Sequence, residues 1–394
     1  MDIKLIRNFE GEKCIPVQGS MVLAVFRADY AIKDYIGRKY MLVDIDSNSK
    51  QEIMPQTPKY DIYDFTDVTC SHDYVYFATA ISTLPDEIHV DIIKYSISGA
   101  DGVIIHSEDY SLHELSDKRI QVIIADEEYL LIQTRTLVTD KADTDYLKME
   151  DIYLYNIADK TKIQVYDELL LTSGIDSIVP VDGNICAVKI GASNLEYKLY
   201  GMNDSLCRER EVIGIVNFRQ FLSDLVLKKE QAVIDILDES GEDTTFPHMK
   251  MMNGCIIYSK ADLKHQKEDI IAYDYANNVT KVRVNDNVRI SDTWRTYLLN
   301  DTMYYIQVNE RFTKLINLNT QKCEWKLGSE YKIRYIKNDI IVVSKHTKRK
   351  LLFKEKDYIF VYRFLDTENY VLKEKAAFAG CVITEDDNLL IFSR

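Results

Sequence analysis

The chain has 394 residues, of which 46% are hydrophobic and 28% are charged, and its formal net charge is −14. A negative field of this size repels nucleic-acid phosphates and anionic membranes, so we expect neither nucleic acid nor membrane as a partner. No apolar run approaches the roughly 18 residues needed to cross a bilayer. The first residues, Met1–Glu10, lack an apolar core and a cleavage site of small residues, so we expect a cytoplasmic protein.

The first predicted element is a strand at Ile3–Phe9, and after it hairpin signals recur along the whole chain. The clearest hairpin has Asn253-Gly254 between two apolar runs, which favours a type I′ turn with positive φ at both central residues. Similar turns recur about 40 to 70 residues apart, a period typical of repeat architectures. Each of the eight turns precedes a dense apolar run, and in chain order these runs are Met21–Phe26, Tyr74–Ala78, Tyr129–Ile132, Ile185–Val188, Ile256–Tyr258, Met303–Ile306, Ile340–Val343 and Leu389–Phe392.

A third strand follows most of these hairpins, often carries tyrosine and ends at the turn formers Asp, Asn or Gly. Its seven copies are Tyr40–Asp46, Ile93–Gly99, Tyr153–Asp159, Tyr197–Asn203, Ile271–Asn277, Lys314–Asn319 and Phe360–Asp366. A short fourth strand comes next, for example Lys162–Val165. Four strands in each repeat of this length resemble the blades of the β-propeller superfamily.

The resemblance implies an all-β fold, a single propeller domain over residues 1–394, with eight four-stranded blades as the best fit and seven as the alternative. The nearly all-apolar second strands are expected to be buried between blades. The last repeat ends after its second strand, so pairing of Ile3–Phe9 with the C-terminal strand would close the ring. The resemblance is one of architecture, since WD40 dipeptides, kelch glycine doublets and repeated Asp-boxes are all missing.

One segment, residues 217–240, interrupts the repeats and is predicted to be a helical insertion between blades. Asn217 is followed three residues later by Gln220, which is typical of a helix N-terminus. Phe218, Phe221 and Leu225 then share one helical face, and the same face includes Leu222 and Val226. Val233, Ile236 and Leu237 extend this helix or start a second one.

No catalytic, metal or cofactor motif stands out, so we expect no cofactor and no metal site. The sequence contains no Gly-x-Ser-x-Gly, no phosphate-binding loop and no dinucleotide fingerprint. None of the seven histidines pairs with a second histidine or a cysteine at the spacing of zinc ligands.

Polar residues at the entry to each first strand are expected to meet at the mouth of the central channel. They form a candidate site for a small polar or anionic ligand, and its members are Asp64, Arg119, Asp176, His248, Arg295 and Arg334. The alternative is that these charges form ion pairs between blades or are solvated at the rim. The sequence also offers two candidate contacts for a protein partner, namely the helical residues Phe218, Phe221 and Leu225 and the basic loop residues Lys345, Lys348 and Arg349.

We therefore predict a non-enzymatic binding or scaffolding propeller that recognises a protein partner or a small polar ligand through one loop face. The alternative is a hydrolase or lyase acting on a small polar or sugar-like substrate at the channel mouth. A third interpretation is a subunit that docks into a larger assembly through the inserted helix.

Overall fold

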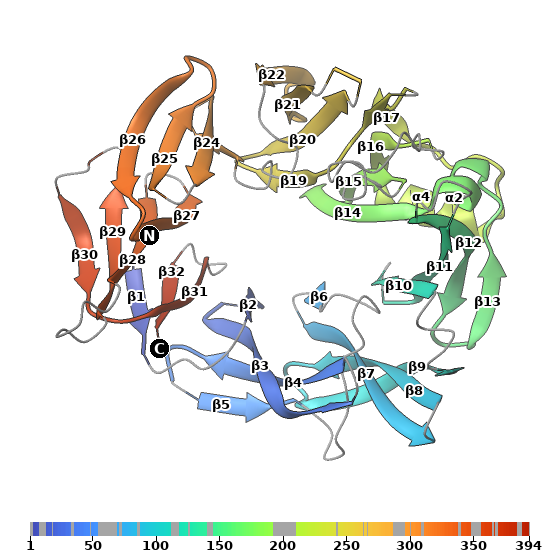
Figure 1. Ribbon diagram of the computed structural model, residues 1–394. Helices are drawn as coiled ribbons and strands as arrows, with labels where there is room; N and C mark the ends of the chain where they lie inside the picture. Colours follow the sequence, from blue (N-terminus) through green and yellow to red (C-terminus); the bar gives the residue numbers. More distant parts are fainter. Residues whose placement is uncertain are drawn as a thin grey trace.

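The eight apolar runs form the second strands of eight β-sheets, and in the computed structural model these sheets stand side by side as the blades of a β-propeller (Figure 1). The predicted all-β, eight-bladed fold is confirmed. The structure describes residues 3–7, 13–17, 19–32, 35–47, 49–53, 69–70, 73–84, 87–111, 118–124, 127–139, 145–191, 210–241, 243–262, 264–265, 267–286, 296–299, 301–308, 311–337, 340–347, 356–364, 366, 369–383 and 388–393.

Each of the first four blades is a four-stranded sheet in which neighbouring strands follow the chain order. Blade 1 comprises β2 (Lys13–Pro16), β3 (Met21–Ile32), β4 (Tyr35–Asp44) and β5 (Ser49–Glu52), and blade 2 comprises β6 (Thr69–Cys70), β7 (Tyr74–Leu84), β8 (Glu87–Ser96) and β9 (Asp101–Ser111). Blade 3 comprises β10 (Lys118–Ile124), β11 (Tyr129–Thr139), β12 (Asp145–Asn156) and β13 (Thr161–Gln164), and blade 4 comprises β14 (Ile175–Asp182), β15 (Ile185–Ile190), β16 (Val212–Asn217) and β17 (Asp235–Glu239).

The second half of the ring is built in the same way, except that blade 5 has an added short strand and blade 8 has three strands. Blade 5 comprises β18 (Thr244–Thr245), β19 (Met249–Met252), β20 (Cys255–Asp262), β21 (Lys267–Asp274) and β22 (Val279–Asp286), and blade 6 comprises β23 (Thr296–Leu299), β24 (Thr302–Val308), β25 (Phe312–Asn317) and β26 (Lys322–Gly328). Blade 7 comprises β27 (Tyr331–Lys337), β28 (Ile340–Thr347), β29 (Lys356–Arg363) and β30 (Tyr370–Glu374), and blade 8 comprises β31 (Phe378–Ile383), β32 (Leu389–Ser393) and β1 (Ile3–Ile6).

The predicted Asn253-Gly254 turn links β19 to β20. Asn253 has φ +50° and Gly254 has φ +73°, which is the left-handed geometry that a type I′ turn requires at both positions. The side-chain amide of Asn253 also donates to the main-chain oxygen of Leu298 in blade 6, at 2.6 Å. The turn therefore both reverses the chain and ties two blades together.

The hydrophobic core is divided into layers between neighbouring blades, because each second strand is buried on both faces. In β3, Leu23 packs with Val75 and Phe77 of blade 2. On the opposite face of the same strand, Val22 packs in a cluster with Leu390 of blade 8. Side chains alternate across a strand, so one continuous apolar run serves two such layers.

The ring closes through β1, which pairs with β32 in parallel orientation from Ile3 opposite Leu389 to Ile6 opposite Phe392. The predicted pairing of the two ends is therefore present in blade 8. A parallel pair needs a long connection between its two strands, and here that connection is the rest of the ring.

Blade 4 departs from the regular pattern in two places. A helix that the sequence pattern did not reveal, α2 (Glu168–Ser173), precedes β14. The helix α4 (Phe218–Val226) forms where the residue spacing predicted it, but it connects β16 to β17 within one sheet, whereas we expected an insertion between blades. Ile236 and Leu237 belong to β17 and not to a helix. The third strand of this blade is β16, while the predicted strand Tyr197–Asn203 lies outside the described residues.

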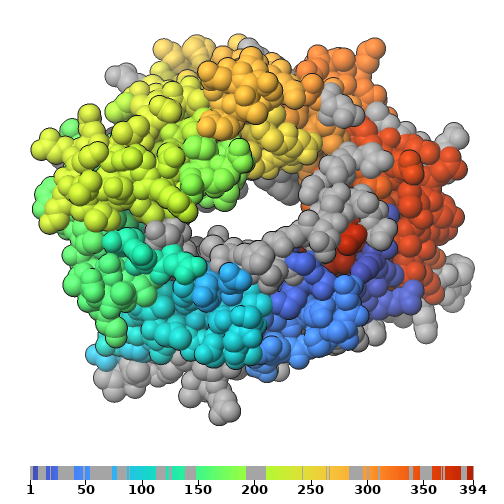
Figure 2. All heavy atoms as spheres, turned by 180° about the vertical axis from the view of Figure 1, so that it is seen from behind, coloured from blue at the N-terminus to red at the C-terminus, as the bar shows by residue number. Residues whose placement is uncertain are grey.

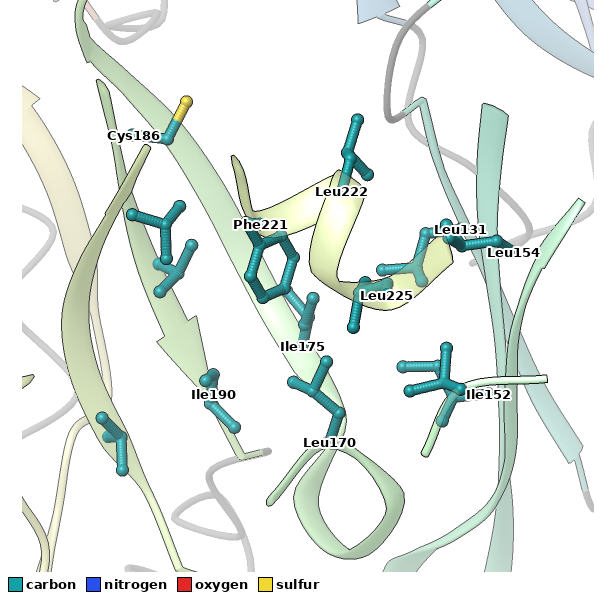
Figure 3. Close-up of a cluster of buried hydrophobic side chains, with 14 of the residues drawn as sticks. Leu131, Ile152, Leu154, Leu170, Ile175, Cys186, Ile190, Phe221, Leu222 and Leu225 are labelled. Atoms are coloured by element: carbon teal, nitrogen blue, oxygen red, sulfur yellow. The ribbon is translucent and has the colours of Figure 1, made fainter. Parts of the chain in front are cut away.

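Helix α4 begins at Asn217, whose side chain accepts a hydrogen bond from the main-chain nitrogen of Gln220 at 3.2 Å. Such a cap satisfies one of the free N–H groups at a helix start. Phe221, Leu222 and Leu225 point into the core between blades 3 and 4, together with Leu170 of α2 (Figure 3). The predicted apolar face of the helix is thus packed on its own propeller.

The segment after α4 is fastened by two buried carboxylates. Asp224 accepts hydrogen bonds from Lys229 Nζ at 2.6 Å and from the main-chain nitrogen of Val233 at 3.2 Å. Asp167, the N-cap of α2, accepts from the main-chain nitrogen of Ala232 at 2.7 Å. The bond from Lys229 is the main reason why the pKa of Asp224 lies below its ordinary value. These hydrogen bonds fix the position of residues 229–233, which lead into β17 at the edge of the sheet.

Neither of the two described helices is long and apolar enough to cross a membrane.

Truncation of the buried Phe221 should destabilise the protein strongly. Its side chain is 1% exposed, so Phe221→Ala is expected to lower the free energy of unfolding by about 3 to 5 kcal/mol. Leu227→Ala, at a residue that is 66% exposed just after the helix, is the matched control and should change it by less than about 0.5 kcal/mol. Urea unfolding measures both, and equal effects of the two variants would contradict the packing described here.

A carboxylate with a shifted pKa lies at the contact between blades 2 and 3. Glu108 on β9 lies 3.5 Å from His106 Nε2 and 3.9 Å from Lys162 Nζ of blade 3, and it accepts a hydrogen bond from the Tyr110 hydroxyl at 2.6 Å. These contacts, led by the hydrogen bond from His106, hold the pKa of Glu108 at about 2. A lowered pKa stabilises the fold at a pH above the ordinary value of 4.5, and this contribution disappears as the pH falls towards 2.

The stability difference between wild type and Glu108→Gln should therefore depend on pH. At pH 7 we expect the variant to be less stable by about 1 kcal/mol, a figure reduced for solvent screening because a third of the side chain is exposed. The difference should vanish between about pH 4.5 and pH 2. Unfolding in urea at a series of pH values measures it, and a difference that persists at pH 2 would show that the effect is one of packing.

Candidate functional site

The first strands of the blades lie at the inner side of the ring, as β2, β6, β10, β14 and β19 do in Figure 1. Seen from behind as spheres, the molecule has an opening through its middle (Figure 2). Side chains at the start of a first strand, and at the ends of the strands paired with it, are therefore near the channel entrance.

A cluster of three charged side chains lies at this end of blade 4. Lys189, near the end of β15, places its Nζ 2.9 Å from Oδ2 of Asp176, near the start of β14. The Lys189 side chain is 2% exposed and the Asp176 side chain is 40% exposed. Glu211, immediately before β16, is fully buried, and its charge is attracted by Lys189 and repelled by Asp176. We call Asp176, Lys189 and Glu211 the ion cluster.

Glu211 lies in a much drier environment than Asp176. One carboxylate oxygen, Oε2, accepts a hydrogen bond from the main-chain nitrogen of Phe246 at 2.9 Å. The other oxygen, Oε1, has no hydrogen-bond partner among the described residues. Burial raises the pKa of Glu211, while the neighbouring Lys189 opposes this shift. The ion cluster thus holds two carboxylates, one reachable from solvent and one enclosed.

Side chains of blade 3 hold the start of β14 in place. Gln121 Nε2 donates to the main-chain oxygen of Asp176 at 3.2 Å, and Gln133 Nε2 donates to Gln121 Oε1 at 2.6 Å. Gln133 also bonds both the main-chain nitrogen and oxygen of Ile175, and Arg135 Nη2 donates to the same oxygen at 3.3 Å. Because Ile175 precedes Asp176, this network fixes the backbone that carries the exposed carboxylate.

Gly174 allows this close approach between blades. Its φ of +65° is a conformation that side chains disfavour. A Cβ atom there would lie 2.7 Å from Met149 Sδ and 2.8 Å from Gln133 Oε1. A glycine is therefore required where α2 ends and β14 begins.

The described residues among those that we predicted at the channel mouth lie on different blades. Of the six, Asp176 alone belongs to the ion cluster. Arg334 lies on β27, where its Nε donates to Ser344 Oγ at 2.8 Å. His248 is exposed between β18 and β19. Arg119 lies on β10, and Asp64 and Arg295 lie outside the described residues.

The residues predicted to contact a partner are also dispersed. Phe221 and Leu225 are each 1% exposed and present no apolar surface, while Phe218 is half-buried and stacked on Phe221. Lys345 lies on β28 and donates to the Tyr331 hydroxyl at 2.8 Å. Lys348 and Arg349 lie outside the described residues.

Lys189 and Glu211 were missed by the sequence analysis. Lys189 is the one charged residue in the otherwise apolar strand Ile185–Ile190, and a lysine is rarely fully buried without a partner. A lysine within an apolar strand was therefore the sequence feature that could have indicated a buried ion pair at Lys189. Glu211 had no comparable signal, because the main-chain nitrogen that it accepts a hydrogen bond from, that of Phe246, is 35 residues further along the chain. Among the described residues, no group of three or more potential metal-ligating side chains could hold a metal ion.

No family model and no curated protein matches this chain. Similar solved structures include the dipeptidyl peptidase 4 of Porphyromonas gingivalis, at 11% identity and a TM-score of 0.49, where the match covers 95% of this chain and 56% of the peptidase. They also include the Dos1 propeller, at 10% identity, a TM-score of 0.44 and coverage of 97% and 92%. An oligogalacturonate lyase in complex with manganese matches at 8% identity and a TM-score of 0.40, over 80% of this chain and 85% of the lyase.

The predicted non-enzymatic binding or scaffolding role is contradicted by these comparisons. The solved structures similar to this chain include peptidases and a lyase, and their likeness to it is one of fold. The sequence interpretation depended on missing catalytic motifs, and charged groups that meet only in the folded chain leave no such motif. This chain spans little more than half the length of the peptidase that it matches.

Removal of the lysine from the ion cluster should be costly. Lys189→Met would leave the enclosed Glu211 without its cation, so we expect the free energy of unfolding to fall by about 3 kcal/mol or more. Addition of Glu211→Gln to this variant should recover part of the loss, because no buried carboxylate would then remain unpaired. Lys260→Met, at a half-buried lysine 2.6 Å from Asp238, is the control with a smaller expected loss. Urea unfolding at pH 7 measures the set, and additive effects of the two changes would contradict the coupling.

Proposed function

We propose that this protein is a hydrolase or lyase that binds a small polar substrate at the entrance of its central channel. The observation that carries the proposal is the ion cluster, in which an exposed carboxylate is held beside a buried lysine. A pair of carboxylates in unlike environments is the arrangement that acid–base chemistry requires, because it separates their pKa values. The opening through the ring supports a route for a small molecule to reach this entrance (Figure 2).

Asp176 is the candidate general base. Its side chain is 40% exposed, so a substrate or a water molecule can reach it. As a base it would remove a proton from water, whose oxygen then attacks the substrate in hydrolysis, or from a carbon atom in elimination. The proton then passes to the leaving group. The hydrogen bonds from blade 3 to the neighbouring backbone keep the carboxylate in one position.

Lys189 and Glu211 act through Asp176 as positioning residues. Lys189 orients the Asp176 carboxylate through the 2.9 Å contact and supplies positive charge where negative charge develops during the reaction. Glu211 is fully buried, and its charge attracts Lys189 from the interior of the blade.

Two of the similar structures suggest which substrate classes to try. Their likeness to this chain is one of fold, so a dipeptide amide and an oligogalacturonate serve as probes of hydrolysis and of elimination. Both are small polar molecules with bonds that a positioned carboxylate can help to break.

Asp176→Asn should abolish most of the activity. Wild type is expected to release amine from the dipeptide amide or to form the unsaturated product from the oligogalacturonate. Loss of a general base lowers turnover by about 100-fold or more. Asp269→Asn serves as the matched control, because Asp269 forms an ion pair with Arg283 at 2.6 Å on the outer strands of blade 5, and it should leave turnover unchanged.

Two results would overturn the proposal. One is a wild-type protein that turns over neither probe under conditions in which it is folded by circular dichroism. The other is turnover by Asp176→Asn equal to that of wild type and of the Asp269→Asn control.

A further inference from the structure

The inner wall of the ring holds more basic than acidic groups among the side chains that the structure describes. We define the inner wall as the eight first strands β2, β6, β10, β14, β19, β23, β27 and β31. The described basic side chains on these strands are Lys250, Lys332 and Arg334, and the described acidic ones are Asp176 and Asp182. Asp176 is paired with Lys189, whereas the chain as a whole has a net charge of −14.

Arg334 is a positioned cation in this wall. Its guanidinium carbon lies 5.3 Å from the ring centre of Phe378, on the neighbouring first strand β31. Its Nε donates to Ser344 Oγ at 2.8 Å, and no carboxylate pairs with it among the described residues. The residue is exposed to solvent, and partial burial of the guanidinium lowers the pKa of Arg334.

Lys250 lies at a second junction between first strands. Its Nζ donates to the main-chain oxygen of Thr296 on β23 at 2.5 Å and lies 5.4 Å from the ring centre of Tyr297. Burial lowers the pKa of Lys250 to about 8, so the ammonium form still predominates at pH 7. The described side chains therefore place two cations at separate points of the inner wall.

We propose that the channel takes a small anionic substrate, one that carries carboxylate or phosphate groups, and that Arg334 is its principal anion contact. This inference rests on the proposed function and names the substrate class for the same channel. Lys250 adds to the attraction for an anion along the channel.

General electrostatics supports this assignment. Charges that line a low-dielectric cleft focus the field there, so an exposed cation in the channel wall attracts small anions even in a protein with a negative net charge. A guanidinium group matches the geometry of carboxylate and phosphate, because its planar fork can donate two parallel hydrogen bonds. Arg334 Nε donates to Ser344 Oγ, and its two terminal nitrogens donate to no other described residue, so they can form that fork.

The test measures binding of pyrophosphate, citrate and uncharged mannitol by isothermal titration calorimetry at low ionic strength and pH 7. We expect at least one anion to bind and mannitol not to bind, with affinity falling as salt is added. The pyrophosphate and citrate arms distinguish a phosphate-bearing substrate from a carboxylate-bearing one. Arg334→Gln should weaken anion binding at least about tenfold, the loss expected for a charge-assisted hydrogen bond.

Two further variants separate the role of the fork from that of charge and folding. Arg334→Lys keeps the charge and loses the fork, so it should bind with an affinity between those of wild type and Arg334→Gln. Lys373→Gln removes one positive charge from β30, the outermost strand of the same blade, where Nζ lies 5.8 Å from the ring centre of Phe360. It should bind anions as wild type does.

The inference is overturned if neither anion binds more tightly than mannitol, or if Arg334→Gln and Lys373→Gln bind anions equally well. Because the measurement is of binding, its failure is distinct from failure of the proposed function. Anion binding without turnover of any probe would overturn the function alone, and turnover of an uncharged dipeptide amide without anion binding would overturn the inference alone.

Discussion

The burial of each second strand on both faces is the constraint on which the whole ring depends. An apolar strand between two sheets has no solvent-facing side, so every blade needs two neighbours to cover it. In β3, Leu23 faces blade 2 while Val22 and Ala24 face blade 8. Each added blade covers one apolar face and exposes another, so all the apolar faces are covered only when the last blade packs against the first. The channel is a consequence, because eight sheets arranged in this way leave an open centre (Figure 2).

The two helices added to blade 4 lie beside the strand that carries Asp176 of the candidate site. Helices α2 and α4 fill the space between blades 3 and 4, and α2 ends at Gly174, immediately before the strand that carries Asp176. The hydrogen bonds of Gln121 and Gln133 hold the backbone at the start of the same strand. The blade with the most additions to the repeat is thus also the one that holds the ion cluster, where two neighbouring blades contribute to a single polar site.

The fold was predictable from sequence because its signal repeats. Eight apolar runs preceded by turn residues predicted the second strands, and the positive φ values of Asn253 and Gly254 follow directly from the identity of those residues. The candidate site was not predictable to the same extent, because its members meet only after folding. Asp176 was found from its place at a strand entry. Glu211 owes its environment to Phe246 of blade 5, and no local pattern links these two residues. Helix α2 has only six residues, too few to show a helical period.

The parallel pairing of β1 with β32 has a consequence for the order of folding. Ile3 lies opposite Leu389, so the two strands that close the ring are separated by nearly the whole described sequence. Loop closure over about 390 residues costs roughly 5 kcal/mol of chain entropy by the logarithmic rule. Until β32 exists, β1 has no partner, and the facing surfaces of blades 1 and 7 remain uncovered. Without the β1–β32 pair the eight blades would form an open arc with a free sheet edge, so this pairing is what makes the arc a ring.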